Sequence, residues 1–450
     1  MKQTNHNYNC IIVGAGPAGL FAALELLKSN VQDILILEKG NSLGQRSRTE
    51  TLCGVGGSGT FSDGKLHFSL NLSQERLLDF CTREQAQSLI DYVEQIFLNY
   101  GVTAPVTPRD ISEVNRLVKQ CREYNIQLYN RRCRHVGSDA LPGIIQNIVN
   151  DLLKHNVEIV TNTTANHFIQ TTSGIDVLTD CQTYHAKTVL VAPGRVGTKW
   201  LQIKAEELKI KYDYQMVEVG IRFEFPASVM EDHSKILYEN IYTLQTPSFD
   251  DPIRTLCPCP NGYVSVENYG DYVCVNGHSN SKNESPNSNF ALLQEITLTE
   301  PVENTTDYAI SIARLATTIG GGKPIIQRLS DLRKNRRSNT ERIRKSIIIP
   351  SLVDCTPGDI SMALPYRVVH NLLEALEILN HVLPGINAGS NFLYAPEIKL
   401  RGSKIQTNRH LETKINRLFV AGDGAGVSGN IVGAAATGIL AARGIAAKLG

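Results

Sequence analysis

The sequence of 450 residues lacks an excess of charge of either sign, because 45 Lys and Arg residues are balanced by 44 Asp and Glu residues, for a formal net charge of +1. This balance argues against a bulk nucleic-acid binder or a polybasic membrane binder, because both need a one-sided field. Hydrophobic residues make up 42% of the chain and charged residues 20%, which is typical of a globular protein with a sizeable core. Intrinsic disorder is therefore excluded as the main state, and 35 glycines without a three-residue period exclude collagen.

Long apolar runs are also missing. No stretch reaches about 18 uninterrupted apolar residues, so no transmembrane helix is expected. The polar N-terminus leads into an apolar segment that Gly14, Gly16 and Gly19 interrupt, which is wrong for a signal peptide. Ten cysteines scattered over the chain are too dilute for a disulfide scaffold. We therefore expect a cytoplasmic protein without a membrane partner.

The most informative motif lies near the start of the chain. Residues 10–13 (CIIV) predict a buried strand, which leads into the glycine-rich turn of residues 14–19 and then into a helix. A second apolar run, residues 34–37, predicts a strand that ends at Glu38. This order of strand, glycine turn, helix, strand and acid is typical of a dinucleotide-binding site. The turn lets a pyrophosphate approach the helix N-terminus, and Glu38 accepts hydrogen bonds from ribose hydroxyls.

A second glycine-containing motif lies near the end of the chain. Residues 418–421 (LFVA) predict a strand, which is followed by Gly422, Asp423 and further glycines and then by an Ala- and Gly-rich helix. If that helix points its N-terminus at a flavin, its dipole stabilises negative charge on the reduced ring. Asp423 is placed to accept a hydrogen bond from a polyol chain such as ribityl. Residues 188–195 (TVLVAPGR) predict a further strand that ends in a turn of small residues.

These three motifs resemble those of FAD-binding flavoproteins of the glutathione-reductase superfamily, and more narrowly of a bacterial family of largely uncharacterised FAD-dependent dehydrogenases. The narrower resemblance is carried by residues 54–65, 135–139, 257–259 and 320–324, and the resemblance spans nearly the whole chain. It implies that Arg46 lies near the phosphates or the flavin, and that Ala165, where the family usually has a larger aliphatic residue, offers its backbone to the adenine. The implied FAD-binding residues are Gly14, Ala15, Gly16, Pro17, Ala18, Gly19, Glu38, Lys39, Arg46, Gly57, Ser58, Gly59, Ala165, Gly194, Gly422, Asp423, Gly429, Asn430 and Ile431.

The expected fold class is α/β, with a discontinuous Rossmann-like FAD-binding domain (GR2-type) and an inserted α+β substrate domain. A surface loop is expected at residues 279–288, which are rich in Ser, Asn and Lys. The FAD-binding domain is expected over residues 1–70, 130–205 and 355–450, a helical insertion over residues 71–129, and the substrate domain over residues 206–354.

The catalytic residues stay unknown from the sequence, and the candidates are Lys65, His135 and Cys257. Lys65 ends the glycine-rich loop 54–65, which can wrap a flat ring and place a cation near flavin N5 or N1; a flexible surface loop is the alternative. His135 can act as a general acid, or it can be a partly buried hydrogen-bonding residue.

The middle cysteines leave several interpretations open. Cys257 and Cys259 are two residues apart, so they allow a reducible thiol pair, pocket-lining thiols or structural thiols. Together with Cys274 and His278 they also allow a zinc site, but this spacing is not a usual zinc pattern. Our prediction is therefore that the chain holds no metal.

The expected function is that of an FAD-dependent oxidoreductase, which transfers a hydride between flavin N5 and a small organic substrate. No second dinucleotide-binding motif is visible, so NAD(P)H is expected only as a transient electron donor. The alternatives are an isoprenoid or polyene double-bond reductase, a non-catalytic FAD-binding protein, and a flavin-dependent protein that modifies or binds RNA. The RNA alternative would use residues 328–345, where eight Lys or Arg residues accompany two acids; the main interpretation has no nucleic-acid partner.

Overall fold

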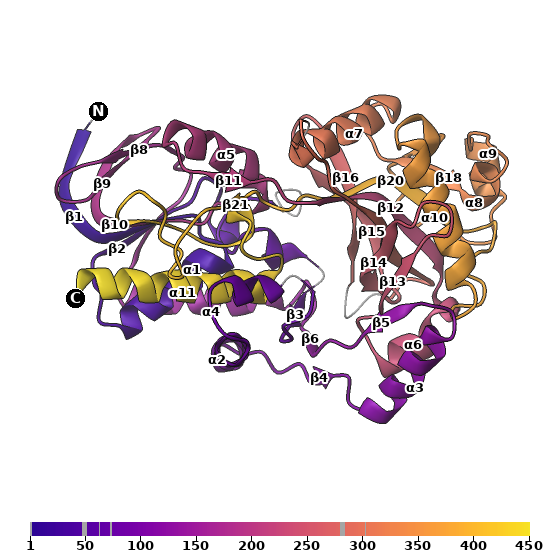
Figure 1. Cartoon of the computed structure of the whole chain (residues 1–450), viewed down its shortest axis with the longest axis horizontal. Coiled ribbons are helices and arrows are strands. Elements are labelled where there is room, and N and C mark those ends of the chain that lie inside the picture. Colours follow the sequence, from indigo (N-terminus) through magenta and orange to yellow (C-terminus); the bar gives the residue numbers. More distant parts are fainter. Residues whose placement is uncertain (1, 47–51, 63, 73, 280–283, 302) are drawn as a thin grey trace. The chain divides into compact units, whose positions relative to one another are not determined.

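The computed structural model describes residues 2–46, 52–62, 64–72, 74–279, 284–301 and 303–450 (Figure 1). The chain divides into two compact units. The first unit comprises Met1–Ala104, Asp139–Gln215 and Arg401–Gly450, and the second unit comprises Pro105–Ser138 and Met216–Leu400.

A mostly parallel sheet forms the centre of the first unit. Its strands β7, β2, β1 and β10 are neighbours in that order, β22 also pairs with β10, and all these pairs are parallel. Strands β9 and β8 continue the sheet in antiparallel pairing. The four side chains of β2 are all buried, as expected for a strand covered on both faces. The bounds are β1 Lys2–Val13, β2 Ile34–Leu37, β7 Glu158–Val160, β8 Ala165–Gln170, β9 Ile175–Thr179, β10 Gln182–Val191 and β22 Leu418–Val420.

Helices α1 and α11 of the first unit pack directly against each other (Figure 1). Their backbones approach closely at Gly438, where an added Cβ would lie 2.0 Å from the carbonyl oxygen of Ala18. The expected α/β fold with a Rossmann-like domain is therefore confirmed. The helices are α1 Pro17–Lys28, α2 Arg83–Asn99, α4 Leu141–Lys154, α5 Thr198–Glu207 and α11 Ile431–Leu449, and the short strands are β3 Lys65–His67, β11 Tyr212–Asp213 and β21 Lys404–Ile405.

Helix α11 is long and apolar enough to cross a membrane by length and composition. It is also largely enclosed, since 67% of its apolar window is buried, and it contacts both α1 and α2. This burial is typical of a core helix made of small residues.

The second unit is built on a largely antiparallel sheet. The strand order is β19-β18-β20-β12-β17-β14-β13-β5, and β15 and β16 form a separate hairpin. Strand β4 pairs with β6. The bounds are β4 Val106–Thr107, β5 Gln127–Tyr129, β6 Cys133–His135, β12 Val217–Pro226, β13 Ile241–Gln245, β14 Pro252–Cys259, β15 Tyr263–Asn268, β16 Val273–His278, β17 Asn287–Ile296, β18 Ile325–Arg328, β19 Thr356–Pro357 and β20 Phe392–Lys399.

Helices α7 and α10 cover this sheet and complete the main core of the second unit. Apolar side chains of both helices, such as Ala313 and Leu372, pack in one cluster with the strand residues Phe223 and Phe290. The helices are α3 Ile111–Arg122, α6 Glu231–Ile236, α7 Thr305–Ile319, α8 Leu329–Leu332, α9 Thr340–Arg344 and α10 Tyr366–Leu379.

The two units divide the chain at positions that differ from the expected domain boundaries. Residues 355–400, expected in the FAD-binding domain, lie in the second unit because β20 pairs with both β12 and β18. Residues 105–129 also lie there, since β5 pairs with β13, whereas α2 of the same expected insertion lies in the first unit. In the expected surface loop, β17 begins at Asn287, and residues 280–283 lie outside the described residues.

Candidate cofactor-binding site

A cleft of about 1140 Å³, partly open to solvent, lies within the first unit. It is lined where parallel strands end: by Val13 of β1, Leu37 of β2, Ala192 after β10 and Gly422 after β22. Ligands of open parallel sheets bind at these carboxyl ends.

The turn between β1 and α1 leaves open space at one glycine and none at the other two. A Cβ added at Gly14 would lie 2.2 Å from the Ala192 carbonyl oxygen. A Cβ added at Gly19 would lie 2.0 Å from the Gly14 carbonyl oxygen. At Gly16, in contrast, the nearest atom would be the Gly57 Cα at 3.8 Å. Gly16 is also the N-cap of α1, and no described side chain caps this helix. The first-turn N–H groups therefore suit an anion in the cleft.

Glu38 follows β2 and lines the cleft, and its buried carboxylate holds three backbone segments. One oxygen, Oε2, accepts a hydrogen bond from Ala15 N at 2.9 Å. The other, Oε1, accepts from Gly40 N at 2.9 Å and from Gly54 N at 3.0 Å. The carboxylate thus joins the glycine turn to the two loops that follow β2.

Arg46 has a comparable positioning role in the same region. Its Nη1 donates to the carbonyl oxygens of Val55 at 2.8 Å and Gly57 at 3.0 Å. Its guanidinium also lies over the Phe61 ring, 4.6 Å from the centroid. The side chain therefore fixes the loop that supplies Gly57, Ser58 and Gly59 to the cleft.

Asp423 lines the cleft just after β22 and is held by two neighbours. Its Oδ2 accepts a hydrogen bond from Arg195 Nε at 3.0 Å, and its Oδ1 accepts one from Ser428 Oγ at 2.5 Å. These contacts connect the turn after β10 with the turn after β22. The ion pair fixes the carboxylate while its outer lone pairs stay available to a ligand hydroxyl.

Asn430 caps the N-terminus of α11 at another side of the cleft. Its Oδ1 accepts hydrogen bonds from Gly433 N at 2.8 Å and from Gln74 Nε2 at 3.1 Å. Gln74 is buried, and its Nε2 also donates to the His67 carbonyl oxygen at 2.6 Å. The Nδ2 of Asn430 is buried and has no hydrogen-bond partner among the described residues. A buried donor of this kind, on a residue that lines the cleft, suits a ligand with an acceptor at that position.

Most of the expected cofactor-binding residues line this cleft, with four exceptions. Ala15 and Arg46 instead make the backbone contacts described above, Gly19 packs against Gly14, and Gly429 offers its carbonyl to Arg195 Nη2 at 3.4 Å. The lining residues from the expected set are Gly14, Gly16, Pro17, Ala18, Glu38, Lys39, Gly57, Ser58, Gly59, Ala165, Gly194, Gly422, Asp423, Asn430 and Ile431.

The sequence interpretation missed several lining residues. Arg195 lines the cleft and directly follows Gly194, which was expected there. Its position beside Gly194 could therefore have indicated it. Cys53, Thr163 and Trp200 carry no such signal, because only the folding of their loops and of α5 brings them to the cleft.

The three catalytic candidates do not all belong to the unit that contains the cleft. Lys65 is buried in β3 of the first unit and is absent from the described lining of the cleft. His135 belongs to the second unit, where its ring stacks on Tyr238 and its Nε2 lies 3.1 Å from Ser279 Oγ. Cys257 also belongs to the second unit, and its carbonyl oxygen accepts a hydrogen bond from Arg222 at 2.6 Å. Asp63 of the glycine-rich loop lies outside the described residues.

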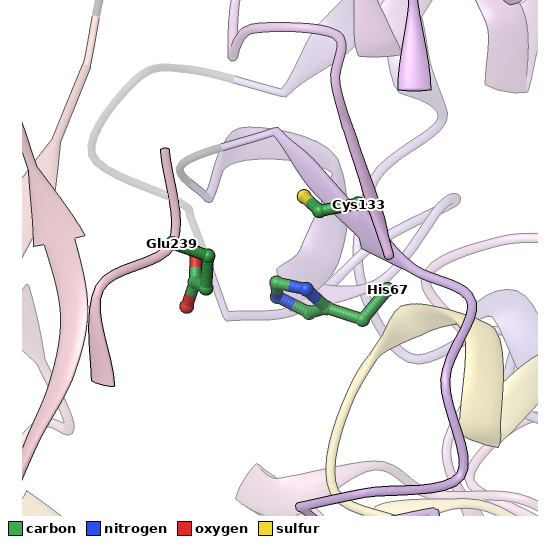
Figure 2. Close-up of side chains that lie close together, drawn as sticks. All are labelled: His67, Cys133 and Glu239. Carbon is green, nitrogen blue, oxygen red and sulfur yellow. The ribbon is translucent and has the colours of Figure 1, made fainter. Parts of the chain in front are cut away.

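The four possible zinc ligands of the middle region are all described residues of the second unit. Cys257, Cys259, Cys274 and His278 do not form a group whose ligand atoms lie within 4.8 Å of one another there. Two other buried side chains of the second unit do lie this close, namely Cys133 and Glu239 (Figure 2). A carboxylate oxygen of Glu239 is also 3.9 Å from Arg131 Nη1. His67, also drawn in Figure 2, ends β3 of the first unit.

Comparison with family models gives three matches along the chain. Residues 217–400 match the model described as "FAD-dependent protein, C-terminal domain-like". Residues 12–83 match an "NAD(P)-binding Rossmann-like domain", and residues 355–450 match "Glucose inhibited division protein A".

Individual relatives are distant. An uncharacterized protein of Clostridium beijerinckii is 23% identical over 476 residues, which cover 97% of this chain and 80% of the relative. Glycine oxidase from Geobacillus kaustophilus is 13% identical with a TM-score of 0.42, covering 98% of this chain and 95% of that structure. L-Proline dehydrogenase from P. horikoshii is 12% identical with a TM-score of 0.41, covering 98% and 93%. Similarity at this level carries no information on substrate.

The family matches confirm the resemblance to FAD-dependent flavoproteins that the motifs predict. The Rossmann match covers β1, α1 and β2, which supply the first part of the cleft. The second unit coincides largely with the FAD-dependent C-terminal model. The chain is thus an FAD-dependent oxidoreductase, and FAD is its cofactor.

Proposed function

We propose that the chain binds FAD in the cleft of the first unit and catalyses hydride transfer between flavin N5 and a small organic substrate. The observation that supports this proposal best is the cleft itself, which combines an uncapped helix N-terminus, an acid after the second strand and a buried unpartnered amide. When bound, FAD supplies the redox chemistry, because its ring accepts or donates a hydride at N5.

The residues of the β1–α1 turn would bind the pyrophosphate. The space at Gly16 admits a phosphate to the backbone, and the α1 dipole favours its negative charge. Glu38 would receive the adenosine ribose hydroxyls on the lone pairs that its three backbone donors leave available. Ala165 would offer its backbone to the adenine.

Asp423 and Asn430 would hold the other half of the cofactor. Asp423, fixed by Arg195, would accept a hydrogen bond from a ribityl hydroxyl. The Asn430 Nδ2 would donate to a ring acceptor, and the N-terminus of α11 would favour negative charge beside it. The Asn430 amide and the α11 N-terminus would raise the electron affinity of the flavin, because both stabilise the negative charge that develops on its ring on reduction.

In this proposal, a domain centred on residues 206–354 recognises the substrate. NAD(P)H acts only as a transient electron donor. The separate antiparallel sheet and core of the second unit support an independent substrate domain.

The test is to purify the full chain, record its visible absorption spectrum and identify the released flavin by chromatography. Anaerobic addition of NADH or NADPH then shows whether the bound flavin bleaches. Gly16→Val should remove the flavin by filling the phosphate space, whereas Gly143→Val, at an exposed glycine of α4 with no described atom within 4 Å of its added Cβ, should retain it. A colourless wild-type protein, or equal flavin content in both variants, would contradict the proposal.

A further inference from the structure

One loop of the second unit presents aliphatic side chains to solvent to an unusual degree. Ile347, Ile349 and Val353 are 88%, 80% and 87% exposed, which makes them the three most exposed large hydrophobic side chains of the described residues. All three belong to residues 346–355, which connect α9 to β19 and which we call the apolar loop. Single exposed apolar residues are common, but a group of this kind indicates an interaction site.

The apolar loop is firmly attached to the second unit. Ile348 is buried in a cluster with Phe392 and Tyr394, so alternate side chains of the loop point inward and outward. The Ile349 carbonyl oxygen accepts a hydrogen bond from Asn287 Nδ2 at 2.7 Å, and Ser351 N donates to the Glu224 carboxylate at 3.2 Å. The backbone that carries the outward aliphatic side chains is therefore fixed by the buried Ile348 side chain and by these two hydrogen bonds.

Positive charge accompanies the loop. Residues 328–345 directly precede it and carry eight Lys or Arg residues against two acids, one of which, Asp331, is fully buried. Several of these cations, including Arg337 and Arg344, are exposed. Lys345 is exposed but pairs with Glu341, and the exposed acid of the loop, Asp354, pairs with Lys323. Figure 1 shows this segment, α8 and α9, beside β18. The surface thus combines protruding aliphatic groups with a cationic border.

We propose that the apolar loop and its cationic border attach this protein peripherally to a bilayer that contains anionic lipid. Aliphatic side chains that protrude can enter the acyl boundary without a preformed pocket, while Lys and Arg attract the headgroups. A second copy of the chain fits less well, because a two-fold contact would bring the same cations of both copies together. The expectation of no membrane partner rests on the lack of a long apolar run, and peripheral attachment does not need one.

The experiment is co-sedimentation of the flavin-loaded full chain with vesicles of phosphatidylcholine and phosphatidylglycerol in equal parts. The expected result is binding that weakens with added salt and is much lower on pure phosphatidylcholine. The combined change Ile347→Ser, Ile349→Ser and Val353→Ser should reduce the partition coefficient about tenfold or more, and Arg337→Gln with Arg344→Gln should reduce both the binding and its salt dependence.

The matched control places the same kind of change on exposed aliphatic residues of the first unit, Leu153→Ser, Ile169→Ser and Ile203→Ser, which are 50%, 50% and 43% exposed. This control should bind vesicles like the wild type, and all variants should keep their flavin. Failure of the wild type to bind anionic vesicles, or equal loss of binding in the loop variant and the control, would overturn the proposal. A dimer in sedimentation velocity that the loop variant abolishes, without vesicle binding, would overturn it in favour of self-association.

Discussion

The Glu38 carboxylate accepts a hydrogen bond from the backbone N–H of Ala15, at 2.9 Å, in the middle of the glycine turn. Because the same carboxylate also accepts from Gly40 and Gly54, it fixes the positions of three segments that border the cleft. An acid at this position is usually interpreted only as a ribose ligand. Here it also fixes the backbone of three segments, so its removal affects stability and cofactor binding together.

Glu38→Gln is therefore expected to destabilise the protein even without flavin. An amide offers one acceptor oxygen, and its NH₂ group would face a backbone donor. Hydrogen bonds to charged groups contribute about 1.5–3 kcal/mol each, so we expect a loss of about 2–4 kcal/mol in the free energy of unfolding of the apo-protein. Urea denaturation measures this loss, with Glu377→Gln on the exposed surface of α10 as the control. Normal apo-protein stability with weaker FAD binding would instead limit Glu38 to contacts with the cofactor.

Gly438→Ala is expected to destabilise the first unit. Its added Cβ would lie 2.0 Å from the Ala18 carbonyl oxygen, so α11 would have to move away from α1. Such overpacking costs about 1–3 kcal/mol. Gly143→Ala, at an exposed position of α4 where the added Cβ meets no described atom within 4 Å, should stabilise by up to about 1 kcal/mol because alanine favours a helix. Thermal unfolding of the two variants should thus shift in opposite directions, and a shift in the same direction would argue against close helix packing.

Gln74→Leu is expected to alter the flavin without unfolding the chain. Its Nε2 donates to Asn430 Oδ1, so the change releases the amide that we place against the flavin ring. We expect a shifted flavin absorption band, a changed reduction potential and FAD binding weaker by about fivefold, the effect of one neutral hydrogen bond. Asn430→Ala should give the same spectral shift, whereas Gln87→Leu, on α2, should not. A purely structural role for Gln74 would lower stability and leave the spectrum unchanged.

His233 makes the stability of the second unit depend on pH. Burial lowers the pKa of this histidine to about 4, and its Nδ1 lies 2.6 Å from Tyr242 Oη. Its ordinary pKa is about 6.5, so between pH 6.5 and 4 the unfolded chain binds more protons than the folded one, and stability falls as the pH falls. From pH 7 to pH 5 this group should cost about 2 kcal/mol. His233→Gln, which still offers Tyr242 an acceptor, should lose less stability over that interval; equal losses would exclude His233 as the cause.

The sequence predicted the local elements that its own apolar periodicity marks. The expected strand at residues 34–37 is β2, and the expected strand at residues 418–421 is β22, with only a one-residue difference at its end. Strand β1, however, begins at Lys2 because polar residues there pair with β10, and pairing with a distant strand leaves no apolar pattern.

The site was predictable where a motif fixes the backbone and not where distant segments meet. The glycine turn, Glu38 and Asp423 were expected at the site because each lies shortly after a strand, and the structure places them at the cleft. The contact between Gln74 and Asn430 joins residues 356 positions apart, so no local pattern could indicate it. The membership of residues 355–400 in the second unit depends in the same way on β20, whose partners lie far away in the sequence.

The discontinuity of the first unit has a consequence for biosynthesis. Strand β10 leaves the ribosome long before β22, its neighbour in the finished sheet, and α11 follows later still. Until then the nascent chain carries an unpaired strand edge, which is a known liability for aggregation. The second unit, in contrast, has all its segments by residue 400 and can fold first. Translation therefore completes the cofactor cleft last, and chaperone dependence should concentrate on the interval between residues 191 and 431.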